Sequence, residues 1–303
     1  MWAAAASPWT KLVAEIGSAA SAITTDMTDP VAVEQLAAAV LAQHGYVDIV
    51  VNNAGFSSQV RHPLRTTAEE FRAVVDVNAL GPIVLTRELL PGMIERGGGD
   101  VVLVNSMAAL TPSVFPGVPY SAAKAAARAY MQVLAKEMRG DGIRCIDVFP
   151  GEVDTPILDN RPMAPDADAR ATMMMPEDIA EVIVLAVSLP RRTTMLEVAL
   201  RPTQPREMAA EVQASRDAQP PQARGGDLRL RQGSRGSRLL QSRNEWWTLA
   251  RLVPLTRPAQ CPPTAVCLAE RQRVIRTGST LHWSGTLAAP IEAKGCTRGG
   301  AGG

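Results

Sequence analysis

Tyr120 and Lys124 stand four residues apart in the stretch VPYSAAKAAARAY, in a chain of 303 residues that holds only three tyrosines. Residues at this spacing share one face of a helix, with about 5–6 Å between their Cβ atoms. An ammonium group that close favours the ionised phenol and lowers the pKa of a tyrosine from its usual value of about 10. We therefore interpret the pair as a candidate acid–base centre that exchanges a proton with an alcohol near neutral pH.

Other polar residues in the same part of the chain fit this chemistry. Ser106 ends the apolar segment DVVLVNS, and a hydroxyl there can donate a hydrogen bond to a carbonyl oxygen that is becoming an alkoxide. Asn78 lies in a helical pattern, where an amide is a poor helix former. The turns VNNAG (51–55) and FPGEVDTP (149–156) each follow an apolar segment. Each feature also has an ordinary explanation as a cap, a turn or a satisfied helix residue, so the chemistry depends on their combination.

Alternating segments of helical and strand period would position these residues. We predict helices over 30–45, 67–97, 119–140 and 176–190, and strands over 47–52, 100–106, 143–151 and 195–202. Asp29 is the candidate N-cap of the first of these helices, and Gly45 ends it. This alternation predicts an α/β fold with a parallel sheet, helices on both faces and ligands at the carboxyl ends of the strands.

The distribution of charge divides the chain near Ser215. Residues 1–215 hold 17 Lys and Arg against 25 Asp and Glu, whereas residues 216–303 hold 14 against 5. The second part is rich in Arg, Gly and Pro and shows no sustained hydrophobic period. We predict one folded domain over 1–215 and a poorly ordered extension over 216–303.

Two functional interpretations of this extension have less support in the sequence than the prediction that it is poorly ordered. Cys261, Cys267, Cys296 and His282 are potential metal ligands, but their spacing fits no compact zinc site, so we predict no metal. Scattered Arg residues beside the adjacent Trp246 and Trp247 could bind nucleic acid, but we predict a disordered extension rather than a nucleic-acid partner. No apolar run reaches the roughly 18–20 residues of a membrane span, and the few scattered cysteines favour a cytoplasmic location.

Taken together and in order, the motifs resemble the short-chain dehydrogenases/reductases, which use NAD(H) or NADP(H). The matching motifs are DMTD, NNAG, the helix Asn in VN, the strand-end Ser, Tyr-x3-Lys and PGxVxT. They extend from Asp26 to Thr155, and more loosely to about Thr203. The resemblance implies a Rossmann-like doubly wound sheet and the interconversion of a secondary alcohol and a carbonyl compound. It also implies a homodimer or homotetramer, and the ending EVALRPTQ looks like the branch that acts on 3-hydroxy acids and small alcohols.

The resemblance implies a role for each matched residue. The catalytic set would be Tyr120 as general acid/base, Lys124 lowering its pKa and holding the nicotinamide ribose, Ser106 polarising the substrate carbonyl, and Asn78 supporting a water-linked proton relay. The cofactor set would be Asp26 and Met27 at the adenine, Asn53 and Gly55 on the adenosine side, Pro150, Gly151, Val153 and Thr155 over the nicotinamide, and again Tyr120 and Lys124.

One family motif has no counterpart in the printed sequence. Family members begin with a strand and a T-G-x3-G-x-G loop that binds the cofactor pyrophosphate, whereas the only glycine before Gly45 here is Gly17. Asp26 aligns with the end of the family's third strand. We therefore predict a sheet that lacks the first two strands, and weak or no binding of NADH and NADPH. An oxidoreductase using NAD or NADP, and a non-catalytic truncated chain that pairs with intact subunits, both remain open.

Overall fold

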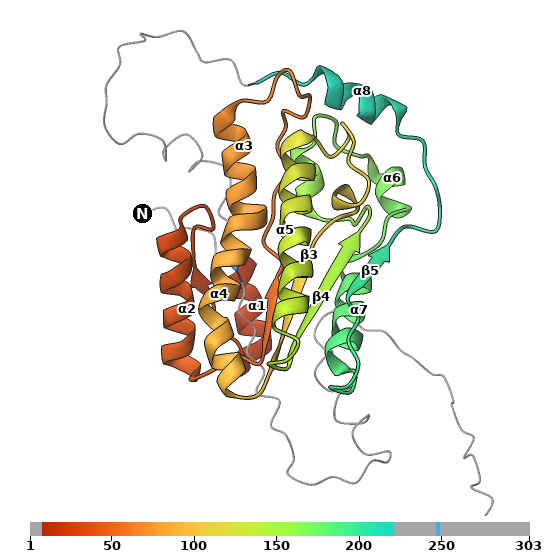
Figure 1. The fold of residues 1–303 in the computed structure, drawn as a ribbon. Coiled ribbons are helices and arrows are strands. Elements are labelled where there is room, and N and C mark those ends of the chain that lie inside the picture. The colour runs from red at the N-terminus through yellow and green to blue at the C-terminus, as the bar shows by residue number, and fades with distance from the viewer. Residues whose placement is uncertain (1–7, 221–246, 249–303) are drawn as a thin grey trace, which may run out of the picture. The chain divides into compact units, whose positions relative to one another are not determined.

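The computed structural model describes residues 8–220 and 247–248 (Figure 1). Its helices are α1 (Pro8–Ile16), α2 (Pro30–His44), α3 (Ala68–Val75), α4 (Gly81–Glu95), α5 (Val118–Glu137), α6 (Ala167–Ala171), α7 (Pro176–Ser188) and α8 (Ala209–Asp217). Its strands are β1 (Ile23–Thr24), β2 (Ile49–Asn52), β3 (Gly99–Val104), β4 (Ile143–Pro150), β5 (Glu197–Leu200) and β6 (Trp247–Thr248). Helix α8 crosses the predicted boundary at Ser215. Most of the predicted extension, with its candidate metal ligands, lies outside the described residues.

The central sheet is parallel, as the sequence predicts. Strands β2, β3, β4 and β5 pair in that order, with Val51 opposite Val102 and Val102 opposite Ile146. Among the described residues, β2 forms one edge of this sheet, whereas β1 pairs with β6 in a separate antiparallel ladder. Because all four strands run the same way, their carboxyl ends meet at one edge, where ligands of such sheets bind.

Helices cover both faces of the sheet, because side chains of a strand point alternately to either side. Val101 and Leu103 of β3 pack in one core cluster with residues of α2, α4 and α5. Val102 of β3 and Ile146 of β4 pack in a second cluster with residues of α7. Figure 1 shows α2, α4 and α5 side by side, with α7 apart from them. The doubly wound α/β arrangement is confirmed.

Local signals in the sequence set the ends of the helices. The Asp29 carboxylate accepts a hydrogen bond from the Val31 backbone nitrogen at 2.9 Å, and Gly45 ends α2 with a φ of 80°. Both predicted caps are confirmed. The helix predicted over 67–97 is instead divided into α3, a π-helical turn (Asp76–Leu80) and α4. Such π turns are frequent at functional sites, and this one contains Asn78.

Candidate active site

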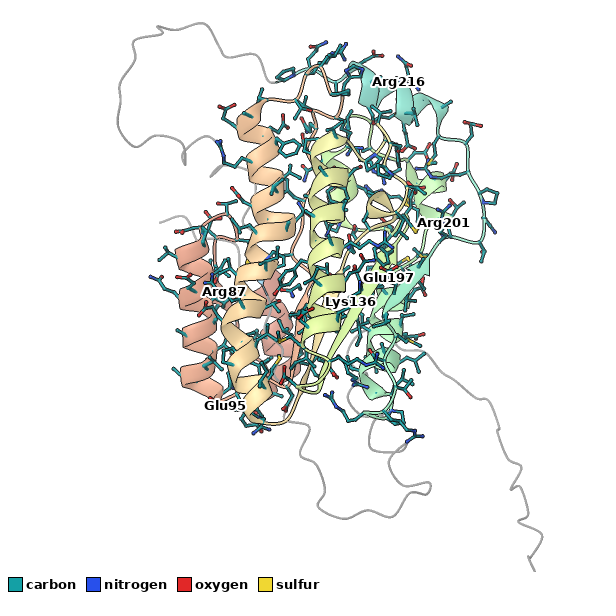
Figure 2. The ribbon with its side chains drawn as sticks, viewed as in Figure 1. Arg87, Glu95, Lys136, Glu197, Arg201 and Arg216 are labelled. Atoms are coloured by element: carbon teal, nitrogen blue, oxygen red, sulfur yellow. The ribbon has the colours of Figure 1, made fainter. Side chains whose placement is uncertain are left out.

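A cavity of about 1120 Å³ opens at the carboxyl edge of the sheet. Its wall takes residues from the segments that follow β2, β3, β4 and β5, and from the first turns of α5. In Figure 2, Arg201, directly after β5, and Arg216 on α8 mark this end of the molecule, whereas Glu95 lies at the opposite end. The parallel order of the strands therefore brings together segments that are distant in sequence.

Nine of the twelve predicted site residues line this cavity. They are Asn53, Gly55, Ser106, Tyr120, Lys124, Pro150, Gly151, Val153 and Thr155. Asn78 lies directly behind Gly55: a Cβ atom at Gly55 would come within 2.8 Å of the Asn78 Oδ1. The structure thus places the predicted catalytic residues in one region.

Asp26 and Met27 do not line the cavity. The Asp26 Oδ1 accepts hydrogen bonds from the Thr28 backbone nitrogen at 2.9 Å and from the Thr28 hydroxyl at 2.7 Å. The Met27 side chain is 2% exposed, and a Cβ atom at Gly81 would lie 2.9 Å from its Cε. Asp26 therefore shapes an exposed turn and Met27 belongs to the core, so their adenine contacts stay a prediction.

Tyr120 and Lys124 lie on one face of α5, as their spacing predicts. Gly117 precedes the helix with a φ of 94°, which favours glycine, and Tyr120 sits in the first turn. The Lys124 side chain is 2% exposed, and its Nζ donates a hydrogen bond to the Val104 carbonyl at 2.9 Å. The same Nζ lies 5.6 Å from the centre of the Tyr120 ring. Strand β3 therefore holds the lysine beneath the tyrosine.

The pKa of Tyr120 differs from the sequence-based prediction. Burial raises it above its usual value, and a hydrogen bond with Ser106 and the positive charges of Arg61 and Arg161 only partly oppose this effect. This net rise is opposite to the fall predicted from the spacing of Tyr120 and Lys124, and Lys124 is not among the groups that oppose it. Helical spacing predicted the distance between the two groups. It could not predict how far burial removes water from the phenol, which is the effect that raises the pKa.

A buried carboxylate lies near Lys124. Burial lowers the pKa of Lys124 to about 8, and the negative charge of Asp147 opposes that fall. Asp147 is 2% exposed, and the Asn105 side-chain amide donates a hydrogen bond to its Oδ2 at 3.1 Å. Burial raises the pKa of Asp147 to about 7, against the opposing effects of Asn105 and Lys124. The lysine and this carboxylate therefore both titrate close to neutral pH.

The Asn78 side chain has one polar atom without a hydrogen-bond partner among the described residues. Its side-chain nitrogen donates to the Phe56 carbonyl at 2.9 Å and to the Val74 carbonyl at 2.8 Å, whereas its buried Oδ1 has no hydrogen-bond partner among the described residues. A Cβ atom at Gly55 would lie 2.8 Å from this oxygen and 3.5 Å from the Lys124 Nζ. Buried polar atoms are normally paired, so this oxygen is available to a ligand or to a water molecule next to Lys124.

The close approach at Gly55 leads to a prediction. We expect Gly55→Ala to lower the free energy of unfolding by about 1–3 kcal/mol, because a methyl group there overpacks against Asn78 and Lys124. The matched control is Gly92→Ala in α4, where a Cβ atom meets nothing within 4 Å; an alanine inside a helix should be neutral or stabilising there. Urea denaturation of both variants measures the difference. Equal stability of the two variants would contradict the crowding at Gly55.

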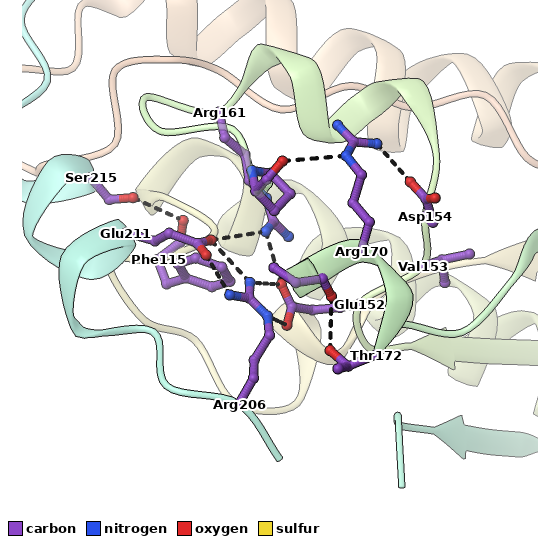
Figure 3. A network of polar contacts seen from close by, with 12 residues as sticks. Phe115, Glu152, Val153, Asp154, Arg161, Arg170, Thr172, Arg206, Glu211 and Ser215 are labelled. Atoms are coloured by element: carbon purple, nitrogen blue, oxygen red, sulfur yellow. Dashed lines mark hydrogen bonds and ion pairs between the residues drawn. The ribbon is translucent and has the colours of Figure 1, made fainter. Parts of the chain in front are cut away.

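Sequence reasoning missed the charged network at the α8 end of the cavity (Figure 3). The Arg206 guanidinium donates to the Glu152 carboxylate at 2.6 Å and also pairs with Glu211 of α8. Arg161 joins the same two carboxylates at 2.8 and 3.3 Å, and its guanidinium lies 4.7 Å from the centre of the Phe115 ring. These residues come from separate segments without a shared motif. The sequence carried no signal that would have grouped them.

Two further properties concern the described part of the chain alone. None of its helices is long and apolar enough to cross a bilayer. Within the same residues, no group of three or more His, Cys, Asp or Glu side chains is arranged to hold a metal ion.

Fold and site together define a nucleotide-binding type of α/β enzyme with a Ser–Tyr–Lys set, and comparison with known proteins names the family. The family model described as short chain dehydrogenase matches residues 2–165. The NADP-dependent 3-hydroxy acid dehydrogenase YdfG of Salmonella typhi is 30% identical over 194 residues, which cover 62% of this chain and 78% of that protein. This chain belongs to the short chain dehydrogenase family.

Solved structures agree with this assignment. The closed form of serine dehydrogenase complexed with NADP+ has a TM-score of 0.59 and 28% identity, with 65% of this chain and 82% of that chain covered. The 3-ketoacyl-(acyl-carrier-protein) reductase from Brucella melitensis complexed with NADH has a TM-score of 0.56 and 27% identity, covering 63% and 80%. The Rossmann-like fold predicted from the sequence is confirmed.

Proposed function

We propose that this protein is an oxidoreductase that interconverts a secondary alcohol and a carbonyl compound with NAD or NADP. The observation that carries the proposal is the convergence of Ser106, Tyr120 and Lys124 in one cavity at the carboxyl edge of the sheet. The relatives support it, since their names include an NADP-dependent dehydrogenase and a reductase complexed with NADH.

The residues present fit the nicotinamide half of such a cofactor. Lys124 reaches the cavity wall with a buried ammonium, and the unpaired Asn78 Oδ1 lies beside the same glycine, Gly55. The wall also includes Pro150, Gly151, Val153 and Thr155, which belong to the end of β4 and the segment after it. We propose that Lys124 holds the ribose and that the segment 150–155 covers the nicotinamide, which when bound would donate or accept a hydride.

The side chains of this protein would handle the accompanying proton. In the direction of reduction, the Tyr120 hydroxyl donates its proton to the carbonyl oxygen as that oxygen gains negative charge, and in oxidation the phenolate takes the proton back. The Ser106 hydroxyl donates a hydrogen bond to the same oxygen. We propose that the Lys124 ammonium, which is charged below its pKa of about 8, partly offsets the rise in the Tyr120 pKa, because its Nζ lies 5.6 Å from the centre of that ring.

The family relationship and the cysteine content support three further proposals. We propose small alcohols or hydroxy acids as substrates, in line with the resemblance of the segment EVALRPTQ. We propose a homodimer or homotetramer as the assembly, and the cytoplasm as its location, where the thiol of the buried Cys145 would stay reduced.

The direct test is a titration of the 303-residue chain with NADH and NADPH, followed by nicotinamide fluorescence and by reduction of small ketones and oxo acids. We expect turnover only at high cofactor concentration, because the printed sequence has no glycine-rich loop to receive the pyrophosphate. Losing two or three charge-assisted hydrogen bonds weakens binding by about a hundredfold or more. Micromolar affinity would refute the weak-binding prediction alone. No turnover at saturating cofactor would refute the proposed function and support a non-catalytic chain.

A further inference from the structure

Arg61 is a buried cation in the cavity wall. Its side chain is 2% exposed, and none of the ion pairs of the described residues includes it. Its Nε donates to the Ser58 carbonyl at 3.1 Å, one Nη to the Ser57 hydroxyl at 3.2 Å, and the other Nη to the Phe115 carbonyl. These acceptors are all uncharged. A guanidinium has five N–H donors, so two of them lack an acceptor among the described residues.

Two other arginines of the cavity wall, Arg161 and Arg206, are neutralised by carboxylates, whereas Arg201 lines the wall as an exposed residue. Arg161 and Arg206 both pair with Glu152 and Glu211, so two positive charges meet two negative charges (Figure 3). The excess positive charge of this group of residues therefore belongs to Arg61. Burial and the nearby charge of Arg161 lower the pKa of Arg61 to about 10. Burial is the larger of these two causes, and the charge of Glu211 partly opposes the fall.

Arg61 also lies close to the proposed proton donor. A Cβ atom at Gly117 would come within 2.9 Å of the Arg61 Cγ, and the backbone carbonyl of Arg61 accepts a hydrogen bond from Val118 at 3.1 Å. Gly117 stands three residues before Tyr120, and the charge of Arg61 acts on the tyrosine. Arg61 and Tyr120 line the same cavity, so an anionic group bound at Arg61 would hold the rest of its ligand in the space that Tyr120 also lines.

We propose that Arg61 is a substrate-binding residue that receives a carboxylate, and that the preferred substrates are short hydroxy acids and the corresponding oxo acids. The inference rests on the proposed function and adds the group that selects the substrate. The planar guanidinium matches a carboxylate with two parallel hydrogen bonds. A neutral ligand of the same shape would leave the buried charge without a counter-ion, so the site should discriminate against it.

The test compares 3-hydroxybutanoate with its neutral amide, 3-hydroxybutanamide. Calorimetry with saturating NADP+ in the Tyr120→Phe background measures both affinities without turnover. We expect the acid to bind about ten- to a hundredfold more tightly than the amide, as a charge-assisted pair allows. Arg61→Gln should bring this acid-to-amide ratio close to one. The matched control is Arg65→Gln, four residues further on and outside the cavity wall, which should keep the ratio.

A second variant covers the case in which Arg61→Gln does not fold. Arg61 also holds the Phe115 carbonyl, so if Arg61→Gln loses its cooperative unfolding transition, Arg61→Lys decides, because it keeps the charge and loses the planar fork. We expect that variant to lower the ratio several-fold, and an unchanged ratio would overturn the proposal. An acid-to-amide ratio near one in the protein that retains Arg61 would also overturn the proposal. Turnover of a neutral ketone with that result would leave the proposed function intact, whereas a high ratio without any turnover would refute the function and keep the carboxylate site.

Discussion

Replacing Tyr120 with phenylalanine is expected to lower the rate of alcohol oxidation and carbonyl reduction by about 10²–10⁴-fold, the usual contribution of a positioned acid–base group. The substitution removes only the hydroxyl oxygen, and the ring keeps its packing against the core cluster of α2, α4 and α5. The proton that must reach the carbonyl oxygen then has no donor in the cavity wall at this position. The measurement is kcat for a small ketone at saturating cofactor.

Binding of the cofactor separates this effect from general damage. Affinity for NADPH, measured by nicotinamide fluorescence, should stay nearly unchanged, because the Lys124 ammonium and the segment after β4 remain in place. Tyr130→Phe is the matched control: this tyrosine lies on the same helix, is also partly buried against the same core, and does not line the cavity. Full activity in Tyr120→Phe, or an equal loss in Tyr130→Phe, would remove Tyr120 from the mechanism.

Asp147→Asn is expected to stabilise the protein above neutral pH. The pKa of this carboxyl rises from 3.8 to about 7 on folding, so between these values the native state binds more protons than the unfolded state. Its contribution to stability is therefore highest at pH 4 and below, falls as the pH rises toward 7, and is constant above that. A shift of about three units corresponds to up to about 4 kcal/mol. Asparagine removes this loss and can still accept the hydrogen bond from Asn105.

The experiment is guanidinium denaturation of both proteins at pH 5 and pH 8. Asp147→Asn should raise the free energy of unfolding more at pH 8 than at pH 5, by several kcal/mol at most. Lys124 makes this difference smaller, because the substitution removes the negative charge of Asp147, which opposes the fall in the Lys124 pKa. Asp141→Asn, in the exposed turn before β4, should keep the pH dependence of the unaltered chain. An identical gain at both pH values would show that Asp147 is not the source of the pH dependence.

The sequence by itself determined the features that depend on local spacing. Helical period and the Asp29 cap identified the helix that starts at Pro30, and short apolar runs identified the parallel strands β2 to β5, since these signals act over a few residues. The four-residue spacing placed Tyr120 and Lys124 on one helix face. The family resemblance supplied the twelve predicted site residues, and nine of them line one cavity at the edge where the ends of the parallel strands meet.

Tertiary structure alone determined the pKa values in the site and the residues that meet at the α8 end of the cavity. The pKa of Tyr120 and of Asp147 depends on how much water the surrounding chain removes, which no short motif records. The π-helical turn at Asn78 appears where a long helix was predicted, and a helical pattern does not reveal one extra residue in a turn. Arg61 and the residues of the charged network (Glu152, Arg161, Arg206 and Glu211) come from separate segments that carry no common signal. Charges that interact through space meet only after the chain has folded, so their partners and their energies were set by packing.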